Sequence, residues 1–193
     1  MALRHAVLAA LLEGEASGYE LAKRFDISIA NFWHAQPQQL YAELARLEDA
    51  GLVEGRLVLQ EKRPNKRVFR ITAHGRAELQ AFAESAPRPT AIKDELLVMV
   101  QAADAADSEA LVRALDERAQ VSAARLRRFE ALAEGLLAGR DEETFLRESA
   151  RVGPYLTLAL GRAFMAEYTA WCRWAASVLQ ERAGVSPPPP ALP

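Results

Sequence analysis

The chain has 193 residues, of which half are apolar and 26% are charged, so it has the composition of a soluble, core-forming protein of one or two domains. Its formal net charge is −2, so net charge does not support a nucleic-acid partner, and any such case has to rest on local clusters. The single cysteine, Cys172, excludes an intramolecular disulfide framework and fits a reducing compartment. We expect neither a signal peptide nor a membrane helix, since the apolar run at the start is short and no stretch reaches about 18 uninterrupted apolar residues, and we expect a cytoplasmic protein.

Residues 1–51 show the pattern of three helices. The first is an apolar stripe at helical spacing that consists of Leu3, Val7, Leu8, Leu11 and Leu12. The segment Ser17-Gly-Tyr-Glu20 matches a capping box, in which two side chains satisfy two unpaired amides, and it predicts a short helix from about Gly18 to Phe25. A third helix begins at Pro37 and ends at Gly51. Its two faces carry Leu40, Leu44 and Leu47 on one side, and Gln38, Gln39, Ala42, Glu43 and Arg46 on the other.

Residues 57–72 predict a β-hairpin with a charged tip. Two β-like runs, Leu57–Glu61 and Val68–Thr72, flank the segment Lys62-Arg-Pro-Asn-Lys-Arg67, in which Pro64-Asn65 is a turn signal. From Lys62 through Arg76 there are six basic residues and no acid. Thr72 can cap a fourth helix that continues through Phe82.

After the break at Pro87-Arg-Pro89 the chain has a wholly helical pattern. One amphipathic helix contains Ile92, Leu96, Met99 and Val100. A long helix, capped by Asp107 or Ser108, extends to about Gly139. The acids at 141–143 favour another helix start, Gly153-Pro154 interrupts that helix by a kink or a stop, and the last helix reaches about residue 182.

The order helix, helix, turn, helix, hairpin, helix, with a basic hairpin tip, is the winged-helix pattern and indicates binding to duplex DNA. The major groove, about 12 Å wide, admits one helix, and the third helix is the candidate, with Gln38 and Gln39 near its N-terminus. Glutamine can pair two-point with adenine, and an acid such as Glu43 can accept from cytosine N4. Basic residues on the hairpin can neutralise phosphates and release counterions. The alternative reading of both features is a solvated face.

Several short segments resemble the PadR family of transcriptional regulators. They are Ser17-Gly-Tyr-Glu-Leu21, Gln39-Leu-Tyr-Ala-Glu-Leu44, Leu47-Glu-Asp-Ala-Gly-Leu-Val53, Arg67-Val-Phe-Arg-Ile-Thr-Ala-His-Gly75, Pro87-Arg-Pro-Thr-Ala-Ile-Lys-Asp-Glu-Leu-Leu97 and Tyr168-Thr-Ala-Trp-Cys172. The resemblance covers nearly all of the chain except the proline-rich tail, and together these short segments are specific for the family. The departures are mild: Ala42 stands where many members have proline, Phe69 where tyrosine is common, and Phe82 where tryptophan is common.

The resemblance implies roles for individual residues. Tyr19, at the start of the second helix, occupies a position that touches backbone phosphate in the family. The start of the recognition helix carries Gln38, Gln39 and Tyr41, and the wing carries Lys62, Arg63, Asn65, Lys66 and Arg67. For Tyr41 the alternative is core packing against Trp33. The resemblance also implies repression that an effector relieves, often an aromatic or phenolic compound.

The last helix has two apolar stripes and is therefore expected to be buried on two sides. One stripe has the alternating spacing of a coiled coil and consists of Leu160, Phe164, Tyr168, Trp171, Ala175 and Val178. The other is spaced seven apart and consists of Leu158, Met165, Cys172 and Leu179. One side can pack on the chain's own long helix and the other on a second subunit, so we expect a homodimer on a palindromic operator. The residues at its interface or in an effector pocket are Phe164, Tyr168, Trp171, Trp174 and Val178, although such stripes are more often core.

No feature of the sequence favours an enzyme. The three histidines, at positions 5, 34 and 74, are scattered, and no metal-ligand spacing or glycine-rich phosphate loop is present. We therefore expect no cofactor. The remaining alternatives are a winged helix that binds only proteins and an activator in place of a repressor.

We thus expect a mainly α fold with three parts. Residues 1–86 form a winged helix-turn-helix with a three-helix core and a two-stranded wing. Residues 87–183 form an all-helical dimerisation and effector domain, and residues 184–193 form a proline-rich disordered tail.

Overall fold

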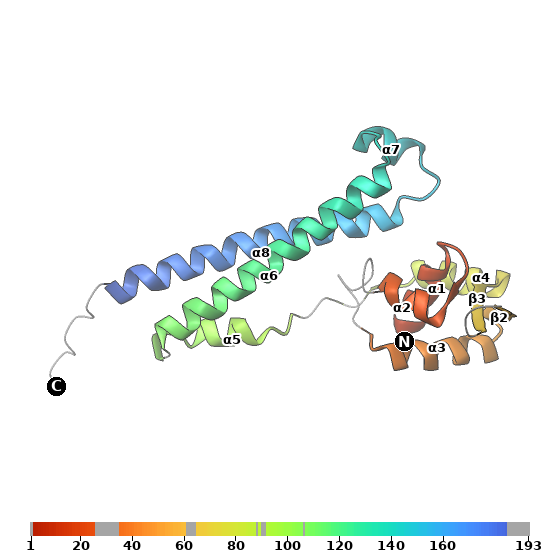
Figure 1. Ribbon diagram of the computed structural model, residues 1–193, viewed down its shortest axis with the longest axis horizontal. Coiled ribbons are helices and arrows are strands. Elements are labelled where there is room, and N and C mark those ends of the chain that lie inside the picture. The colour runs from red at the N-terminus through yellow and green to blue at the C-terminus, as the bar shows by residue number, and fades with distance from the viewer. Residues whose placement is uncertain are drawn as a thin grey trace. The chain divides into compact units, whose positions relative to one another are not determined.

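The computed structural model describes residues 2–25, 35–60, 65–87, 89, 92–105 and 107–184. The chain divides into two compact units, Met1–Pro89 and Thr90–Pro193 (Figure 1). Among the described residues, no helix has both the length and the apolar character needed to cross a membrane.

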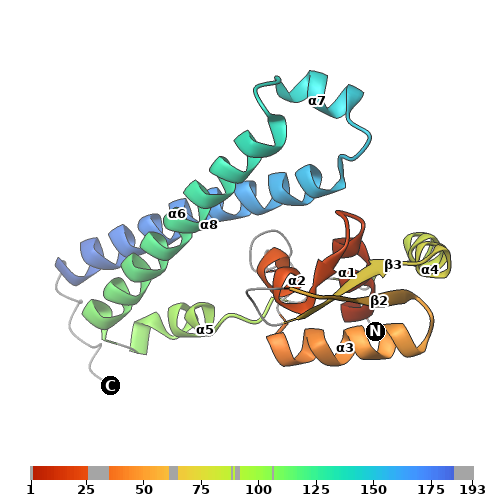
Figure 2. The same cartoon turned by 45° about the vertical axis from the view of Figure 1, so that its right-hand side comes forward.

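The N-terminal unit packs four helices with a small antiparallel sheet. In chain order its elements are α1 (Ala2–Leu11), β1 (Ala16–Ser17), α2 (Gly18–Arg24), α3 (Pro37–Asp49), β2 (Val53–Val58), β3 (Lys66–Ile71) and α4 (Ala73–Ala83). The strand order is β1-β3-β2, so the predicted two-stranded wing gains a short third strand from the segment before α2. Figure 2 shows β2 and β3 as a hairpin with α3 beside it.

The helix stripes predicted from the sequence form the core of this unit. Leu8 of α1, Leu21 of α2 and Leu44 of α3 are each at most 1% exposed, and they pack with Val53 and Ile71 of the sheet. Burial of side chains of this size stabilises a fold by about 1.5–3 kcal/mol each. The three helices and the sheet are therefore held by one common core.

The predicted helix starts are confirmed by their caps. Ser17 and Glu20 form the expected capping box at α2, and the Thr72 hydroxyl accepts a hydrogen bond from the Gly75 amide at the start of α4. Pro37 is the first residue of α3, and Gly51, with a φ of 68°, follows its C-cap.

The predicted strand boundaries were wrong by several residues. The first strand is not Leu57–Glu61 but Val53–Val58, and the second begins at Lys66 instead of Val68. Gly55 obscured the first strand, because a glycine between β-like residues resembles a break. A Cβ at this position would lie 2.6 Å from both Arg67 Nε and Glu48 Oε1, so these two side chains would have to shift to admit one.

The C-terminal unit is wholly helical. Its elements are α5 (Glu95–Gln101), a short 3₁₀ turn η2 (Ala103–Ala105), α6 (Ser108–Leu137), α7 (Glu142–Glu148) and α8 (Gly153–Gly184). Helices α6 and α8 pack side by side as a long antiparallel pair (Figures 1 and 2). Asp107 caps α6 and Asp141 caps α7, as the acidic starts predicted.

Two details of this unit differ from the sequence prediction. Ile92 precedes α5, which begins only after Asp94, its N-cap. Gly153 and Pro154 neither kink a helix nor end one, because α7 has already stopped at Glu148 and α8 starts at Gly153. Proline is well tolerated in a first helical turn, where its missing amide has no intrahelical partner.

The two apolar stripes of α8 are buried to different extents. Leu158 and Cys172 of the second stripe are at most 4% exposed and pack inside the unit, where burial raises the pKa of the Cys172 thiol. In the first stripe Leu160 is 71% and Phe164 50% exposed. The second stripe thus serves the chain's own core, and two of the six residues of the first stripe are exposed.

Candidate nucleic-acid interface

Helix α3 presents Gln38 and Gln39 at its start. Gln39 takes part in the N-terminal cap of the helix, whereas Gln38 does not. The backbone amide of Gln36, the N-cap residue, donates to the Gln39 side-chain oxygen over 2.9 Å. Two-point pairing with adenine needs both the oxygen and the amide nitrogen of a glutamine, so Gln39 would have to give up this cap. Gln38 is exposed next to it and is the better placed of the two to meet a base.

Glu43, on the same helix, does not project freely toward a base. Its side chain is only 13% exposed and forms an ion pair of 3.2 Å with Arg46 one turn later. Arg46 is 74% exposed and carries the outward charge of this face. The acid inferred from the sequence as a cytosine acceptor therefore lies mostly covered.

Tyr19 and Tyr41 both lie where α2 meets α3. Tyr19 is 72% exposed and Tyr41 50% exposed. The Tyr41 ring rests on Gly18, the first residue of α2, where a Cβ would come within 2.2 Å of its Cε1 atom. The alternative partner considered from the sequence, Trp33, lies outside the described residues.

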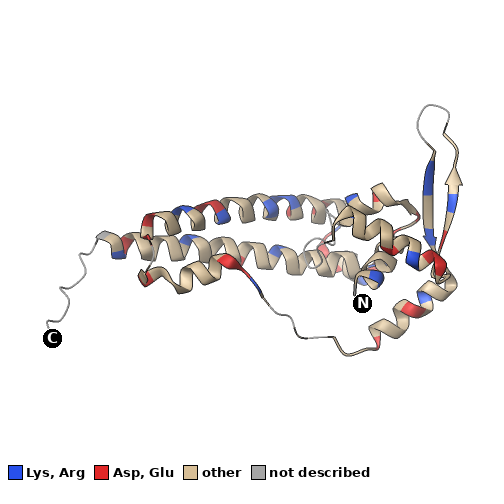
Figure 3. Ribbon diagram, turned by 90° about the horizontal axis from the view of Figure 1, so that it is seen from below, with Lys and Arg blue, Asp and Glu red and all other residues tan. Residues whose placement is uncertain are grey.

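The wing residues fall into three groups. Lys62 and Arg63 lie outside the described residues. The Asn65 side-chain oxygen accepts a hydrogen bond of 3.0 Å from the Gln60 amide and so closes the hairpin beneath its tip. Lys66 and Arg67 begin β3, and Figure 3 shows basic residues along both strands of the hairpin.

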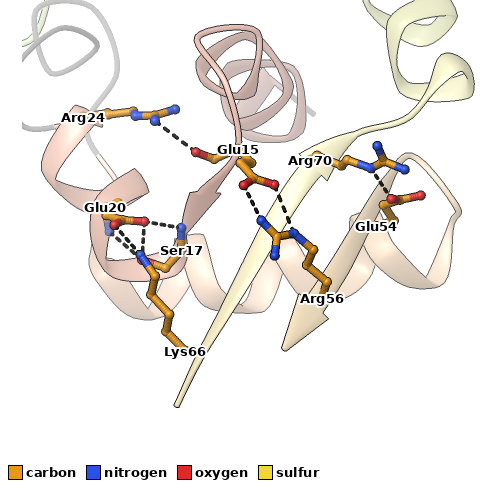
Figure 4. A network of polar contacts seen from close by, with 8 residues as sticks. All are labelled: Glu15, Ser17, Glu20, Arg24, Glu54, Arg56, Lys66 and Arg70. Carbon is orange, nitrogen blue, oxygen red and sulfur yellow. Dashed lines mark hydrogen bonds and ion pairs between the residues drawn. The ribbon is translucent and has the colours of Figure 1, made fainter. Parts of the chain in front are cut away.

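Each Lys and Arg that the structure describes on β2 and β3 is paired with a glutamate. Lys66 Nζ lies 2.8 Å from Glu20, and Arg67 Nη2 lies 2.7 Å from Glu48. Two further pairs join Arg56 to Glu15, at 2.5 Å, and Arg70 to Glu54 (Figure 4). Of the six basic residues counted from Lys62 through Arg76, three, Lys66, Arg67 and Arg70, are therefore paired with acids 16–46 residues away in sequence.

Glu20 gathers the largest set of donors in this network. It accepts hydrogen bonds from the Ser17 amide and the Ser17 hydroxyl, each over 2.8 Å, as well as from Lys66 (Figure 4). The hydrogen bond from Lys66 and those from Ser17 lower the pKa of Glu20 from 4.5 to about 2. One carboxylate thus caps α2 and ties β3 to it.

In the C-terminal unit, three of the five predicted aromatic-face residues form a ladder along α8. Phe164 stacks on Tyr168 at a centroid distance of 5.6 Å, and Tyr168 stacks on Trp171 at 5.9 Å. Trp174 is 62% exposed and Val178 is half-buried, and neither takes part in these stacking contacts.

A polar contact that the sequence analysis missed fixes the middle of this ladder. Tyr168 hydrogen-bonds to Asp94 and, over 2.8 Å, to Arg118, which itself lies 2.8 Å from Asp94. Burial and the hydrogen bond to Asp94 raise the pKa of Tyr168 to about 12. The capping role of Asp94 was detectable as an acid directly before an apolar helical run, whereas no local signal identifies Arg118.

Comparisons with known proteins cover both units. The family described as "Transcriptional regulator PadR-like family" matches residues 7–81, and "Virulence activator alpha C-term" matches residues 92–180. A probable transcriptional regulator of Mycobacterium tuberculosis is 37% identical over 196 residues, which cover 94% of this chain and all of that protein. The negative transcriptional regulator PadR of Bacillus subtilis is 27% identical over 170 residues, 88% of this chain and 92% of that one.

The solved structures of B. subtilis PadR have the same fold. Its complex with operator DNA superposes with a TM-score of 0.76 at 24% identity, covering 93% of this chain and 99% of that one. Its complex with p-coumaric acid superposes with a TM-score of 0.69 at 24% identity, covering 92% and 95%. The winged helix-turn-helix with a helical C-terminal region, predicted from the sequence, is confirmed.

The depressed pKa of Glu20 predicts a specific sensitivity to acid. A carboxylate whose pKa falls on folding contributes stability above its unfolded pKa of about 4.5 and loses it as the pH falls toward about 2. Because the Glu20 and Lys66 side chains are 44% and 36% exposed, we expect the Glu20 carboxylate to contribute at most about 1 kcal/mol to the free energy of unfolding. Urea unfolding of Glu20→Gln between these pH values should show a shallower loss of stability than the wild type.

Lys66→Gln should reduce the pH-dependent contribution of Glu20 to the free energy of unfolding without abolishing it, because Ser17 still donates to Glu20. If the stability of Glu20→Gln falls with pH as steeply as that of the wild type, Glu20 is not the source of this acid sensitivity.

Proposed function

The chain belongs to the PadR family of transcriptional regulators, and from this premise we propose that it is a homodimeric repressor that binds operator DNA and is released from it by a small aromatic effector. As a member of this family it is a transcriptional regulator and not an enzyme. The observation that carries the DNA-binding proposal is α3, which buries Leu40, Leu44 and Leu47 and leaves Gln38 exposed at its start. In a helix-turn-helix the N-terminal residues of the second helix of the motif contact base edges.

Repression is favoured by the similarity to B. subtilis PadR, which is named a negative transcriptional regulator. One observation keeps activation as a second candidate: the C-terminal unit matches a family described by a virulence activator. A winged helix that binds only proteins is disfavoured, because the relatives that match are regulators of transcription and one of them was crystallised with operator DNA.

The homodimer is supported by exposed apolar side chains on α8, two of them from its first stripe. Leu156, Leu160 and Phe164 recur every fourth residue and are 50–71% exposed, so they form an apolar line along one face of the helix. Soluble monomers seldom expose contiguous apolar surface of this kind. A dimer would cover it and would bring two winged helices to half-sites about 34–36 Å apart.

The effector proposal rests on the α8 ladder and on one relative. B. subtilis PadR was crystallised with p-coumaric acid, an aromatic carboxylic acid. The ladder of this chain offers the half-exposed ring of Phe164 for stacking, next to Tyr168. We place the effector contact at this end of the ladder, with Trp171, Trp174 and Val178 farther along the helix.

We expect Gln38→Ala to weaken binding to the operator and to relax the preference at one base pair by about 1–3 kcal/mol. The measurement is fluorescence anisotropy with the duplex upstream of the chain's own gene and with single-base variants of it. Gln120→Ala, an exposed glutamine on α6, is the matched control and should bind as the wild type does. Equal base preferences in Gln38→Ala and the wild type would argue against α3 as the reader.

The dimer predicts that Leu160→Ser combined with Phe164→Ser shifts the protein toward monomer, because two large apolar side chains leave the interface. Sedimentation velocity at micromolar concentration measures this directly. Ala163→Ser, on the same helix, adds a hydroxyl without removing a large side chain and should leave the dimer intact. A wild-type protein that sediments as a monomer would refute the proposal.

Repression and release are tested by one transcription assay in vitro. The protein is expected to lower transcription from the promoter that carries its operator, and p-coumaric acid is expected to restore it. Transcription that rises on adding the protein would favour the activator. Repression that the acid leaves unchanged would remove this acid as the effector.

A further inference from the structure

The ion pairs of the wing bear on how the protein distinguishes DNA sequences. Lys66 and Arg67 are the first residues of β3, next to the hairpin tip, where a wing would meet phosphates. In the free protein both already have a carboxylate partner, Glu20 and Glu48. A duplex that uses these two cations has to separate them from their glutamates first.

We propose that Glu20 and Glu48 are specificity-determining residues, which hold Lys66 and Arg67 in intramolecular ion pairs and so suppress binding to nonspecific DNA. This inference rests on the proposed DNA binding and assigns these glutamates a part in it. The chain uses acids that lie far from the wing in sequence to keep its cations from phosphates until base contacts favour docking.

The glutamates are fixed independently of the cations. Glu20 is held by the Ser17 amide and hydroxyl, and Glu48 accepts a hydrogen bond of 3.0 Å from the Gly55 amide. These bonds keep the carboxylates in place when a cation leaves. Their negative charges then remain beside the wing and oppose an approaching phosphate backbone.

The second pair is built into the sheet. Arg67 reaches Glu48 across Gly55, where a Cβ would collide with both side chains, and its guanidinium lies 5.7 Å from the centre of the Phe69 ring. Lys66 and Arg67 are 36% and 57% exposed in their side chains. Ion pairs this exposed add little to stability, so a purely structural role explains little of their presence.

Nonspecific affinity arises almost entirely from phosphate contacts and the counterions that they release. A cation that stays paired with its glutamate contributes neither. On the operator, base contacts from α3 favour close docking and the pairs open. On other sequences no such contacts exist and the pairs persist, so the glutamates weaken nonspecific binding more than operator binding.

The test measures the full-length Glu20→Gln and Glu48→Gln variants against a short duplex of mixed sequence over a range of salt concentrations. Glutamine keeps an acceptor oxygen for Ser17 or Gly55 and removes the charge. We expect each variant to bind this duplex about threefold to tenfold more tightly than the wild type, with a salt slope steeper by about 0.9, the value of one added phosphate contact. The ratio of operator to mixed-sequence affinity should fall.

Glu84→Gln is the matched control, because it makes the same change in net charge at an exposed position at the end of α4. A second control is Lys66→Gln. If the gain in Glu20→Gln comes from freeing Lys66, it should vanish when both changes are combined.

Two results would overturn the inference: mixed-sequence affinities of Glu20→Gln and Glu48→Gln equal to that of Glu84→Gln, or a gain in Glu20→Gln that persists without Lys66. A wild-type protein that binds no duplex at low salt would instead refute the proposed function itself, and the inference with it. Circular dichroism spectra of all variants are the check that each retains its helices, and we expect them to match the spectrum of the wild type.

Discussion

The contact between the Glu20 carboxylate, Ser17 and Lys66 joins the wing of the N-terminal unit to its helix-turn-helix, whose helices and sheet are held by one common core. It closes the capping box that starts α2 and joins that helix start to the first residue of β3. The segment before α2 also pairs with β3 as a short strand, with Ser17 opposite Val68. The wing is thus attached to the helix-turn-helix by backbone pairing and by an ion pair at the same place.

A chain with a net charge of −2 needs a source of DNA affinity other than its overall charge. Overall charge offers no attraction to a polyanion, and the described cations of the two wing strands are matched by glutamates. For the wing to bind phosphates, its internal ion pairs must open. Base contacts made by α3 would have to supply the free energy for this exchange. In such a regulator, nonspecific DNA binding is weaker and discrimination among DNA sequences is correspondingly greater.

The sequence predicted the helices well, but it did not predict which charged residues form ion pairs. Helix starts at Ser17, Pro37, Thr72 and Asp107 depend on local chemistry within a few residues, and they were found. The strand from Val53 was missed in part because Gly55 resembles a break, although in the structure Gly55 lies within the strand and against the Arg67–Glu48 pair. Partners such as Glu20 and Lys66, 46 residues apart, leave no local signal. Which residues of the α8 stripes are exposed likewise depends on the face of α8 that packs on α6, and sequence spacing alone does not determine that face.

The most direct test of the central claim is selection of duplexes from a random DNA library by the full-length wild-type protein. A homodimer with α3 as the reader predicts that the enriched duplexes share an inverted repeat, with half-site centres about one helical turn, 34–36 Å, or a multiple of it apart. Retention of DNA without enrichment of any sequence, or no retention at all, would contradict the claim.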